Sequence, residues 1–384
     1  MKRRDFIKQS VVGALALAAL DKNGKAFGNE SRPSRYSATP DGVPQAKPFV
    51  LRGVNLGGWL VLEKWMVPSV YRGCEASDEY GLSLALGSKA ESRLNQHREK
   101  FITAEDFKWI KNRGLNAIRL PVGYWTLEGP KPYVTAEDFL DFAFEQASQN
   151  GLKVLLDLHG APGSQNGWDH SGRSGGIGWD KNPDNIRETV RVLAGFAQKF
   201  GSHPALFGIE LLNEPSTQIP IQTLKEFYIE AYSQIRKHAG EQVAVVFHDS
   251  FRAMDWKNFM KAPDFSNVIM DTHLYQLFTK DDARRTAQEQ IAFALNRKFT
   301  LEEMQAEELP TLVGEWSLGL PESSAKNLSL FQGDLLHGAF ADAQLLSFEN
   351  SRGWFFWSYK TESDSEWNFR HCVQRGWLPE QFPA

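Results

Sequence analysis

The stretch LFGIELLNEP, residues 206–215, is the most informative part of this 384-residue chain. Its first seven residues form a short apolar run, typical of a buried strand, and the run ends abruptly at Asn213 and Glu214. Similar runs recur along the chain, each followed by a polar or glycine-rich stretch. We expect eight strands, at residues 50–55, 117–122, 153–158, 206–212, 243–247, 268–272, 311–314 and 353–357.

Segments with helical periodicity lie between these runs, for example at residues 136–150, 185–200, 221–239 and 330–349. This alternation predicts an α/β fold with a parallel sheet. A doubly wound open sheet would show the same local pattern, but eight units in one chain favour closure into a (β/α)8 TIM barrel. In such a barrel the functional side chains gather at the C-terminal ends of the strands, which is where Asn213 and Glu214 stand.

The first residues have the pattern of an export signal. Lys2, Arg3 and Arg4 precede an apolar run at residues 11–20, which is shorter than the about 20 residues that a membrane-spanning helix needs. The arginine pair followed by Asp-Phe-Ile-Lys resembles a twin-arginine signal. We predict a twin-arginine type signal peptide at 1–28, a linker at 29–47 and one domain at 48–384. The protein would pass through the twin-arginine export machinery to the periplasm or the extracellular space.

Composition narrows the classes of partner. The formal net charge of -4 and the lack of long basic runs give no support for binding to nucleic acid or to an anionic membrane. No later stretch is long and apolar enough to predict a membrane span in the mature protein. Cys74 and Cys372 are the only cysteines, which leaves a disulfide open but excludes a thiolate metal cluster.

Two glutamates follow predicted strands in a way that indicates chemistry. Glu214 ends the fourth apolar run and Glu315 ends the seventh, on nearly opposite sides of the predicted barrel mouth. Glycoside cleavage needs one protonated carboxyl group to donate to the leaving oxygen and one ionised carboxylate to attack the anomeric carbon. Either glutamate alone would more often be a solvated or ion-paired side chain. Together they predict a retaining β-glycosidase that uses no cofactor and no metal ion.

Seven motifs, in order, carry a resemblance to a known family. They are RGVNLGGWLVLE at 52–63, IRLPVGYW at 118–125, DLHGAPGSQNG at 157–167, GIELLNEP at 208–215, HLYQLF at 273–278, GE at 314–315 and GWFFWSYKTE at 353–362. Over residues 51–369 the chain resembles glycoside hydrolase family 5, and within it the exo-β-1,3-glucanases of fungi. The resemblance implies hydrolysis of a β-glucan or an oligosaccharide derived from it.

The resemblance also implies roles for individual residues. Glu214 would be the general acid/base and Glu315 the nucleophile. Arg119 would support the nucleophile by placing a positive charge beside it, although a structural ion-pair anchor predicts the same contact. Tyr275 matches the position that hydrogen-bonds the nucleophile, and His273 matches the position near the acid/base. The matched positions that bind the sugar are Asn213 and His159 at its hydroxyl groups, Trp357 as an aromatic floor, and Glu63 and Asp169 at the rim.

Two aromatic positions bear on the substrate class. Trp168 and Phe278 match a pair of rings that clamp the sugar at the entrance of the fungal enzymes, which favours a β-glucan substrate. His170 stands where those enzymes usually have Asn, and residues 173–180 depart from their pattern. The linkage and the depth of the pocket therefore stay open, as does the alternative that Trp357 is simply a buried core residue.

Three other functions compete with this interpretation. An endo-acting β-1,4-glucanase or mannanase would use the same chemistry in an open groove. A metal-dependent barrel hydrolase is suggested by the pairs Asp157 with His159 and Asp271 with His273, because alternate residues of a strand share one face. The family resemblance accounts for both histidines without a metal. A non-catalytic glucan-binding barrel is disfavoured because both glutamates are present.

Overall fold

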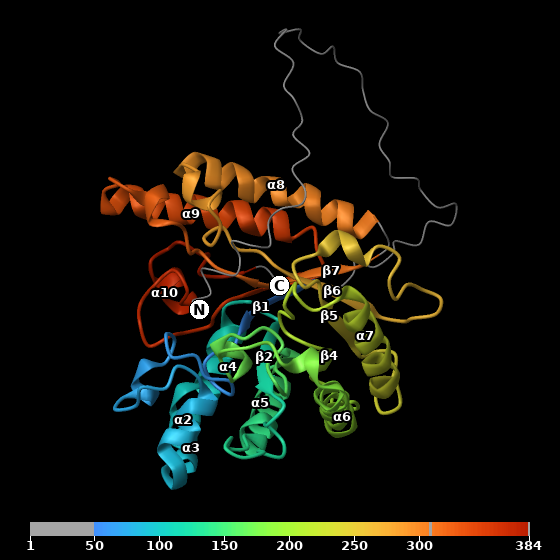
Figure 1. Cartoon of the computed structure of the whole chain (residues 1–384). Coiled ribbons are helices and arrows are strands. Elements are labelled where there is room, and N and C mark those ends of the chain that lie inside the picture. The colour runs from blue at the N-terminus through green and yellow to red at the C-terminus, as the bar shows by residue number, and fades with distance from the viewer. Residues whose placement is uncertain (1–49, 307–308, 383–384) are drawn as a thin grey trace.

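The computed structural model describes residues 50–306 and 309–382, and the predicted signal peptide and linker lie outside the described residues. Eight parallel strands follow one another around a closed barrel, and the last pairs with the first (Figure 1). This closure confirms the predicted (β/α)8 barrel. The strands are Leu51–Asn55 (β1), Ala117–Gly123 (β2), Lys153–Gly160 (β3), Leu206–Glu210 (β4), Ala244–His248 (β5), Val268–His273 (β6), Thr311–Trp316 (β7) and Gly353–Phe356 (β8).

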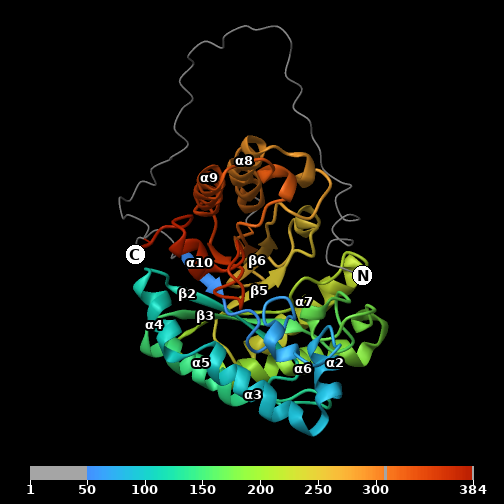
Figure 2. The ribbon, with the colours of Figure 1, turned by 90° about the vertical axis from the view of Figure 1, so that its left-hand side faces the viewer.

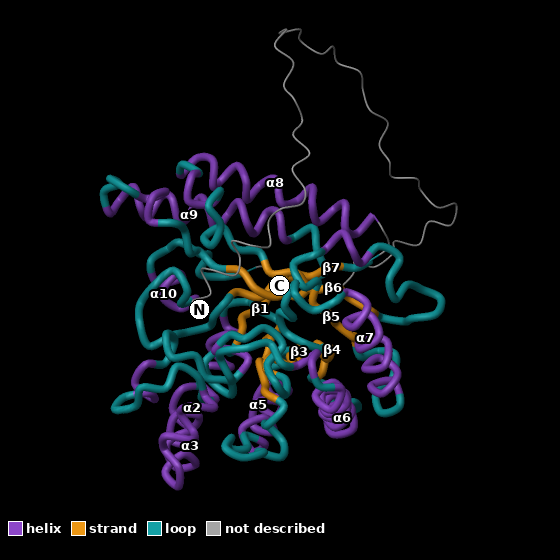
Figure 3. Tube along the Cα trace, in the orientation of Figure 1, coloured by secondary structure: helices purple, strands orange, loops and turns teal. Residues whose placement is uncertain are grey.

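Helices surround the strands on the outside of the barrel, as the purple and orange tubes of Figure 3 show. Their bounds are Glu79–Leu86 (α2), Ala90–Phe101 (α3), Ala104–Asn112 (α4), Glu137–Gln149 (α5), Pro183–Phe200 (α6), Ile221–Arg236 (α7), Ala287–Ala306 (α8), Leu330–Phe348 (α9) and Phe369–Gln374 (α10). The four helical segments expected from the sequence correspond to α5, α6, α7 and α9. Seen from the side in Figure 2, α3, α5 and α6 cover one flank of the barrel, and α8 and α9 stand together on the other.

The fourth strand ends earlier than its apolar run predicts. β4 ends at Glu210, whereas the run continues to Leu212. Beyond the strand, the main chain of Leu211 still donates to Val246 (2.9 Å) and that of Asn213 to Leu158 (2.9 Å). Glu214 then takes a left-handed backbone conformation with φ of 42°. The chain therefore turns at Glu214 while neighbouring strands still hold it.

The barrel interior changes character along the strands. One buried apolar cluster consists of Leu51, Ala117, Leu155, Ala244, Val246, Ile269, Leu312 and Phe355. Two positions further along four of the same strands stand fully buried polar residues, namely Arg119, Asp157, His248 and Asp271. Residues two apart in a strand share a face, so both layers line the interior. An apolar layer therefore supports a charged layer that is nearer the C-terminal face of the barrel.

Both cysteines are free thiols, so the disulfide that the sequence left open is not formed. Cys372 is buried, and burial raises the pKa of its thiol, whereas Cys74 is half-buried. Among the helices that the structure describes, none combines the length and the apolar character needed to cross a bilayer.

Candidate active site

Glu214 and Glu315 meet at the C-terminal face of the barrel. Glu315 belongs to β7 and Glu214 follows β4, and the two side chains are buried. The Nδ1 atom of His273 lies 2.8 Å from Oε1 of Glu214 and 3.5 Å from Oε2 of Glu315. These two oxygens are therefore separated by at most the sum of the two distances, about 6.3 Å. Retaining pairs lie about 5–5.5 Å apart and inverting pairs about 6.5–9.5 Å, so the geometry favours retention.

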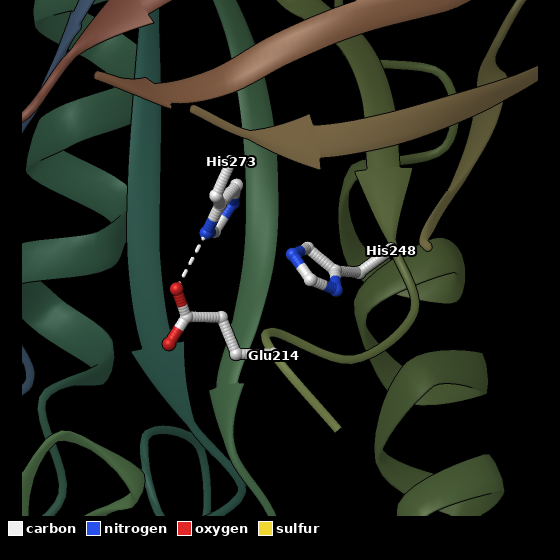
Figure 4. A group of neighbouring side chains, drawn as sticks. All are labelled: Glu214, His248 and His273. Carbon is white, nitrogen blue, oxygen red and sulfur yellow. Dashed lines mark hydrogen bonds and ion pairs between the residues drawn. The ribbon is translucent and has the colours of Figure 1, made fainter. Parts of the chain in front are cut away.

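His273 connects the two glutamates. Figure 4 shows its ring, from β6, pointing at Glu214, with His248 from β5 beside them. The Nε2 atom of His273 is 3.3 Å from Oδ2 of Asp271. Burial by itself lowers the pKa of His273, but the charges of Glu315 and Asp271, with hydrogen bonds to Asp271 and Glu214, outweigh burial and raise this pKa well above its usual range. The raised pKa favours the imidazolium form of His273, and its ring contacts both glutamates.

Arg119 of β2 lies at the centre of a buried network of charges beneath the glutamates. Its guanidinium donates two hydrogen bonds to Glu210 (2.7 and 2.9 Å) and one to Oε1 of Glu315 (3.1 Å). It also donates to Oδ1 of Asn213 (2.8 Å) and lies 3.1 Å from Asp157. Burial alone lowers the pKa of Arg119, but the charges of Asp157 and Glu210 outweigh burial and raise it. The predicted contact with Glu315 is present, and the same side chain anchors two further carboxyl groups.

Tyr275 supplies the second donor to Glu315. It lies in the loop after β6, and its hydroxyl donates to Oε2 of Glu315 at 2.7 Å. Because Arg119 donates to Oε1, each oxygen of Glu315 has its own donor, which fixes the plane of the carboxylate. The carbonyl of Tyr275 accepts a hydrogen bond from Arg297 of α8 (3.0 Å), which ties this loop to the outer helix.

Three of the residues expected to bind the sugar form one cluster. The ring of His159 stacks on Trp357 with centroids 5.3 Å apart and planes within 6°. Its Nδ1 lies 2.6 Å from Asp157, and burial lowers the pKa of His159 to about 3, so the imidazole is neutral. The amide nitrogen of Asn213 is 3.4 Å from His159 and 3.5 Å from His170. Asn213, His159 and Trp357 are thus brought together, as the sequence predicts.

The two predicted rim residues occupy different surroundings. Glu63 is buried and accepts a hydrogen bond from the indole of Trp65 at 2.7 Å. Trp65 is 39% exposed and packs edge-on against Trp367, with ring centroids 5.7 Å apart. Asp169 is half-buried and begins a short 3-10 helix, Asp169–Ser171. Their part in substrate binding stays a prediction.

A cavity of about 250 Å³ opens beside the glutamates. Its lining includes His273, Tyr275 and Phe278, together with Phe251 from the loop after β5. The ring of Phe278 lies 5.5 Å from that of Tyr275. Trp168 is 7% exposed and is not among the residues that line this cavity. The pairing of Trp168 and Phe278 across an entrance therefore remains a prediction.

Sequence reasoning assigned no role to three buried polar residues of the site. Glu210 bonds Arg119, and His170 places Nε2 at 3.4 Å from Oε2 of Glu214. His248 has a ring centroid 4.3 Å from that of His273, and burial lowers its pKa. For Glu210 a signal was available in the sequence, because it is an acidic residue inside an apolar run. A buried charge needs a partner, so its position predicts a buried ion pair.

Two groups of side chains could each offer three ligand atoms to a metal ion. They are Glu214, His248 and His273, and Glu210, Asp271 and His273. In both groups His273 is positively charged, and it already contacts Glu214 and Asp271. Arg119 adds a second positive charge, 3.9 Å from Asp271. These contacts account for the acidic and histidine side chains without a metal ion.

Comparisons with known proteins agree with this site. A family model described as cellulase, glycosyl hydrolase family 5, matches residues 81–363. The chain is 37% identical to the glucan 1,3-beta-glucosidase of Blumeria graminis, over 86% of this chain and 87% of that protein. It is also 37% identical to the probable glucan 1,3-beta-glucosidase A of Emericella nidulans, over 86% of this chain and 90% of the relative.

Solved structures share the fold at low sequence identity. Rutinosidase from Aspergillus niger superposes with a TM-score of 0.74 at 21% identity, covering 86% of this chain and 98% of the other. Endoglucanase Cel5A from Thermotoga maritima gives a TM-score of 0.56 at 16% identity, covering 86% and 95%. The family model and the relatives in sequence lead to one conclusion: the chain belongs to glycoside hydrolase family 5 and is a retaining glycoside hydrolase.

Proposed function

We propose that the chain is an exo-β-1,3-glucanase in which Glu214 is the general acid/base and Glu315 is the nucleophile. One observation supports these roles above the others: each oxygen of Glu315 accepts a hydrogen bond, one from Arg119 and one from Tyr275, and such bonds favour the ionised form that a nucleophile needs. The substrate class is inferred from the relatives, whose names describe glucan 1,3-beta-glucosidases.

In the first step, an oxygen of Glu315 attacks the anomeric carbon while the bond from that carbon to the leaving oxygen breaks. Glu214 donates its proton to the leaving oxygen, and a covalent glycosyl-enzyme forms. Arg119 and Tyr275 orient the attacking carboxylate through one hydrogen bond on each oxygen. Asn213 has its carbonyl oxygen held by Arg119, so its amide group faces His159 and is placed to donate to a sugar hydroxyl.

In the second step, water attacks the anomeric carbon, Glu214 takes a proton from that water, and Glu315 departs as a carboxylate. The change of role has an electrostatic cause. A negative charge on one carboxyl group disfavours a second one nearby, and the first step uses Glu214 in its protonated form. Esterification removes the charge of Glu315, and the ionised form of Glu214 is then favoured beside His273.

Product analysis tests the substrate. The purified protein should release glucose alone from a β-1,3-glucan and act less on β-1,4- and β-1,6-glucans. A ladder of oligosaccharides would contradict exo action, and a preference for a β-1,4-glucan or a mannan would replace the proposed substrate while leaving the chemistry unchanged.

Two variants test the roles of the glutamates. Glu214→Ala should accumulate a glycosyl-enzyme on an aryl glucoside with a good leaving group, because the nucleophile is intact, and intact-protein mass would detect it. Glu315→Gln should form none. Glu226→Gln on the exposed face of α7 is the matched control. An active Glu315→Gln enzyme would refute the assignment.

Export is part of the proposal. Arg3 and Arg4 stand before an apolar run, in the order that a twin-arginine signal requires. We expect the protein to act in the periplasm or outside the cell. Replacing both arginines with lysine should retain the enzyme inside the cell, which fractionation followed by a glucosidase assay would show.

A further inference from the structure

A second concave surface, separate from the site of the two glutamates, is strongly basic. It has a volume of about 750 Å³ and is bounded by α3, by the 3-10 helix Pro68–Tyr71 and by Glu362, which follows β8. Figure 1 places α3 on the outside of the barrel, beside α2. Four cations line this basic groove: Arg72, Lys89, Arg93 and Lys100. The whole chain has a formal net charge of -4, so this is a local concentration of positive charge.

The spacing of the cations along α3 gives the groove its length. Lys89, Arg93 and Lys100 follow at intervals of four and seven residues, which places them on one face of a helix. At 1.5 Å per residue, the row extends for about 16 Å. The acidic residues of the same helix, Glu91 and Glu99, do not line the groove. A single small anion would contact only part of such a row.

The groove keeps an excess of positive charge, and hydrogen bonds hold one of its cations, Arg93. Among its described lining residues the one carboxylate is Glu362, and that carboxylate already accepts hydrogen bonds from the main chain of Ser69 (2.9 Å) and from its hydroxyl. Arg93 donates to the carbonyls of Ser69 (3.3 Å) and Arg72 (2.7 Å), which holds its guanidinium in place. The positive charge of the groove is therefore available to a ligand and partly preorganised.

The remaining lining favours a sugar chain over a nucleic acid. Hydroxyl and amide groups that can bond sugar hydroxyls lie between the cations, namely those of Ser88, Ser92 and Gln96. Single-stranded nucleic acids are commonly bound by stacking their bases on several aromatic rings. Apart from His97, the aromatic ring in the lining is that of Phe101. The ammonium of Lys360 lies 5.5 Å from the centroid of this ring.

We propose that the basic groove binds an acidic polysaccharide, a chain whose successive sugar units carry carboxylate groups. The cations pair with the carboxylates and the serine and glutamine side chains bond the hydroxyls. The site would hold the enzyme on an acidic glycan, and it is independent of the glucanase activity proposed above.

Binding of a hexamer of galacturonic acid tests this inference, with the neutral hexamer of β-1,3-linked glucose, inorganic phosphate and a single-stranded hexanucleotide as comparison probes. The groove variant combines Arg72→Gln, Lys89→Gln and Lys100→Gln, three exposed positions. The matched control combines Lys237→Gln, Lys280→Gln and Lys326→Gln, which are exposed elsewhere and remove the same charge. Turnover of an aryl glucoside by both variants checks that they are folded.

The galacturonate hexamer should bind more tightly than the other three probes, and its affinity should fall with added salt. The groove variant should bind it about tenfold more weakly, the factor expected from the loss of three exposed charge contacts. The control should stay within about twofold of the parent. Absence of galacturonate binding at low salt, equal losses in both variants, or tighter binding of phosphate or the hexanucleotide would overturn the proposal.

Discussion

Tyr275→Phe should slow the second half of the proposed reaction more than the first. The hydroxyl of Tyr275 donates to Oε2 of Glu315 at 2.7 Å, and phenylalanine removes only this hydroxyl. The ring contacts with Trp367 (5.4 Å) and Phe278 (5.5 Å) should remain. In the second step Glu315 departs as a carboxylate, so negative charge develops on the carboxyl group that the hydroxyl stabilises.

The magnitude follows from that one bond. A hydrogen bond to a charged group contributes about 1.5–3 kcal/mol, which corresponds to roughly a 10- to 150-fold change in rate. With an aryl glucoside whose leaving group departs easily, hydrolysis of the intermediate limits turnover. We expect kcat to fall by that factor and KM to fall as well, because the glycosyl-enzyme accumulates. The value of kcat/KM, which reports the first step, should change less.

Pre-steady-state kinetics provides the assay. The Tyr275→Phe enzyme should release a burst of the aryl leaving group, followed by slow turnover. Tyr232→Phe is the matched control and should leave both phases unchanged, since Tyr232 lies on the outer helix α7 and its hydroxyl accepts a hydrogen bond from the main chain of Ser266 (2.9 Å). Unchanged kcat, or equal losses in kcat and kcat/KM without a burst, would refute the reasoning. A lowered melting temperature would indicate a structural role instead.

Three further predictions concern the gate, the network and the stability of the fold. Trp168→Ala should raise KM for a β-1,3-linked oligosaccharide more than for an aryl glucoside. An equal loss of activity on both substrates, with a large fall in melting temperature, would show that this buried ring only fills the barrel mouth. Arg119→Met should cost about 3–5 kcal/mol in denaturant unfolding, because it leaves buried carboxylates without a counter-ion, and a smaller loss would argue against an anchoring role. Burial lowers the pKa of His97 to about 4, below the value of about 6.5 in the unfolded chain. As the pH falls, the unfolded chain is therefore protonated at His97 before the folded protein is. The contribution of His97 to stability is complete above pH 6.5 and is lost as the pH falls toward 4. His97→Gln should therefore remove about 2.5 kcal/mol of the difference in unfolding free energy between pH 7 and pH 4.5, and a pH dependence equal to that of the parent would contradict this assignment.

Much of the barrel could be predicted because its signals are local. Each strand is a short apolar run, and all eight end within two residues of the predicted position. β4 ends two residues before its apolar run does. After Glu210, single main-chain hydrogen bonds from Leu211 and Asn213 connect the chain to the neighbouring strands. The sequence pattern does not give bounds for helix α8. Its span from Ala287 to Ala306 nevertheless follows β6, as the alternation of strands and helices requires.

The buried network could not be predicted in the same way, because it depends on pairs that are distant in sequence. Arg119 and Glu210 are 91 residues apart and bond through the barrel interior. A strand pattern shows which side chains face inward, but not which of them meet across the barrel. His170 is a further example, since only the fold brings it to 3.4 Å from Glu214.

Charge balance within this network determines which of its carboxyl groups are ionised. Arg119 and His273 supply the positive charges there. Burial raises the pKa of Glu210, although the charge of Arg119 and the two hydrogen bonds that it donates act in the opposite direction. Burial raises the pKa of Asp157 to about 8 and that of Asp271 to about 6. Burial therefore shifts both carboxyl groups toward their protonated forms.

The two glutamates of the proposed mechanism depend on that balance. A negative charge on one of them disfavours a second negative charge on the other, which suits a first step that uses Glu214 as the acid and Glu315 as the nucleophile. Esterification of Glu315 removes one negative charge, and ionisation of Glu214 then restores the balance. Because His273 contacts both glutamates, at 2.8 and 3.5 Å, it can stabilise whichever of them is charged. The same arrangement of side chains therefore supports the acid step and the base step, and the electrostatics require no rearrangement between them.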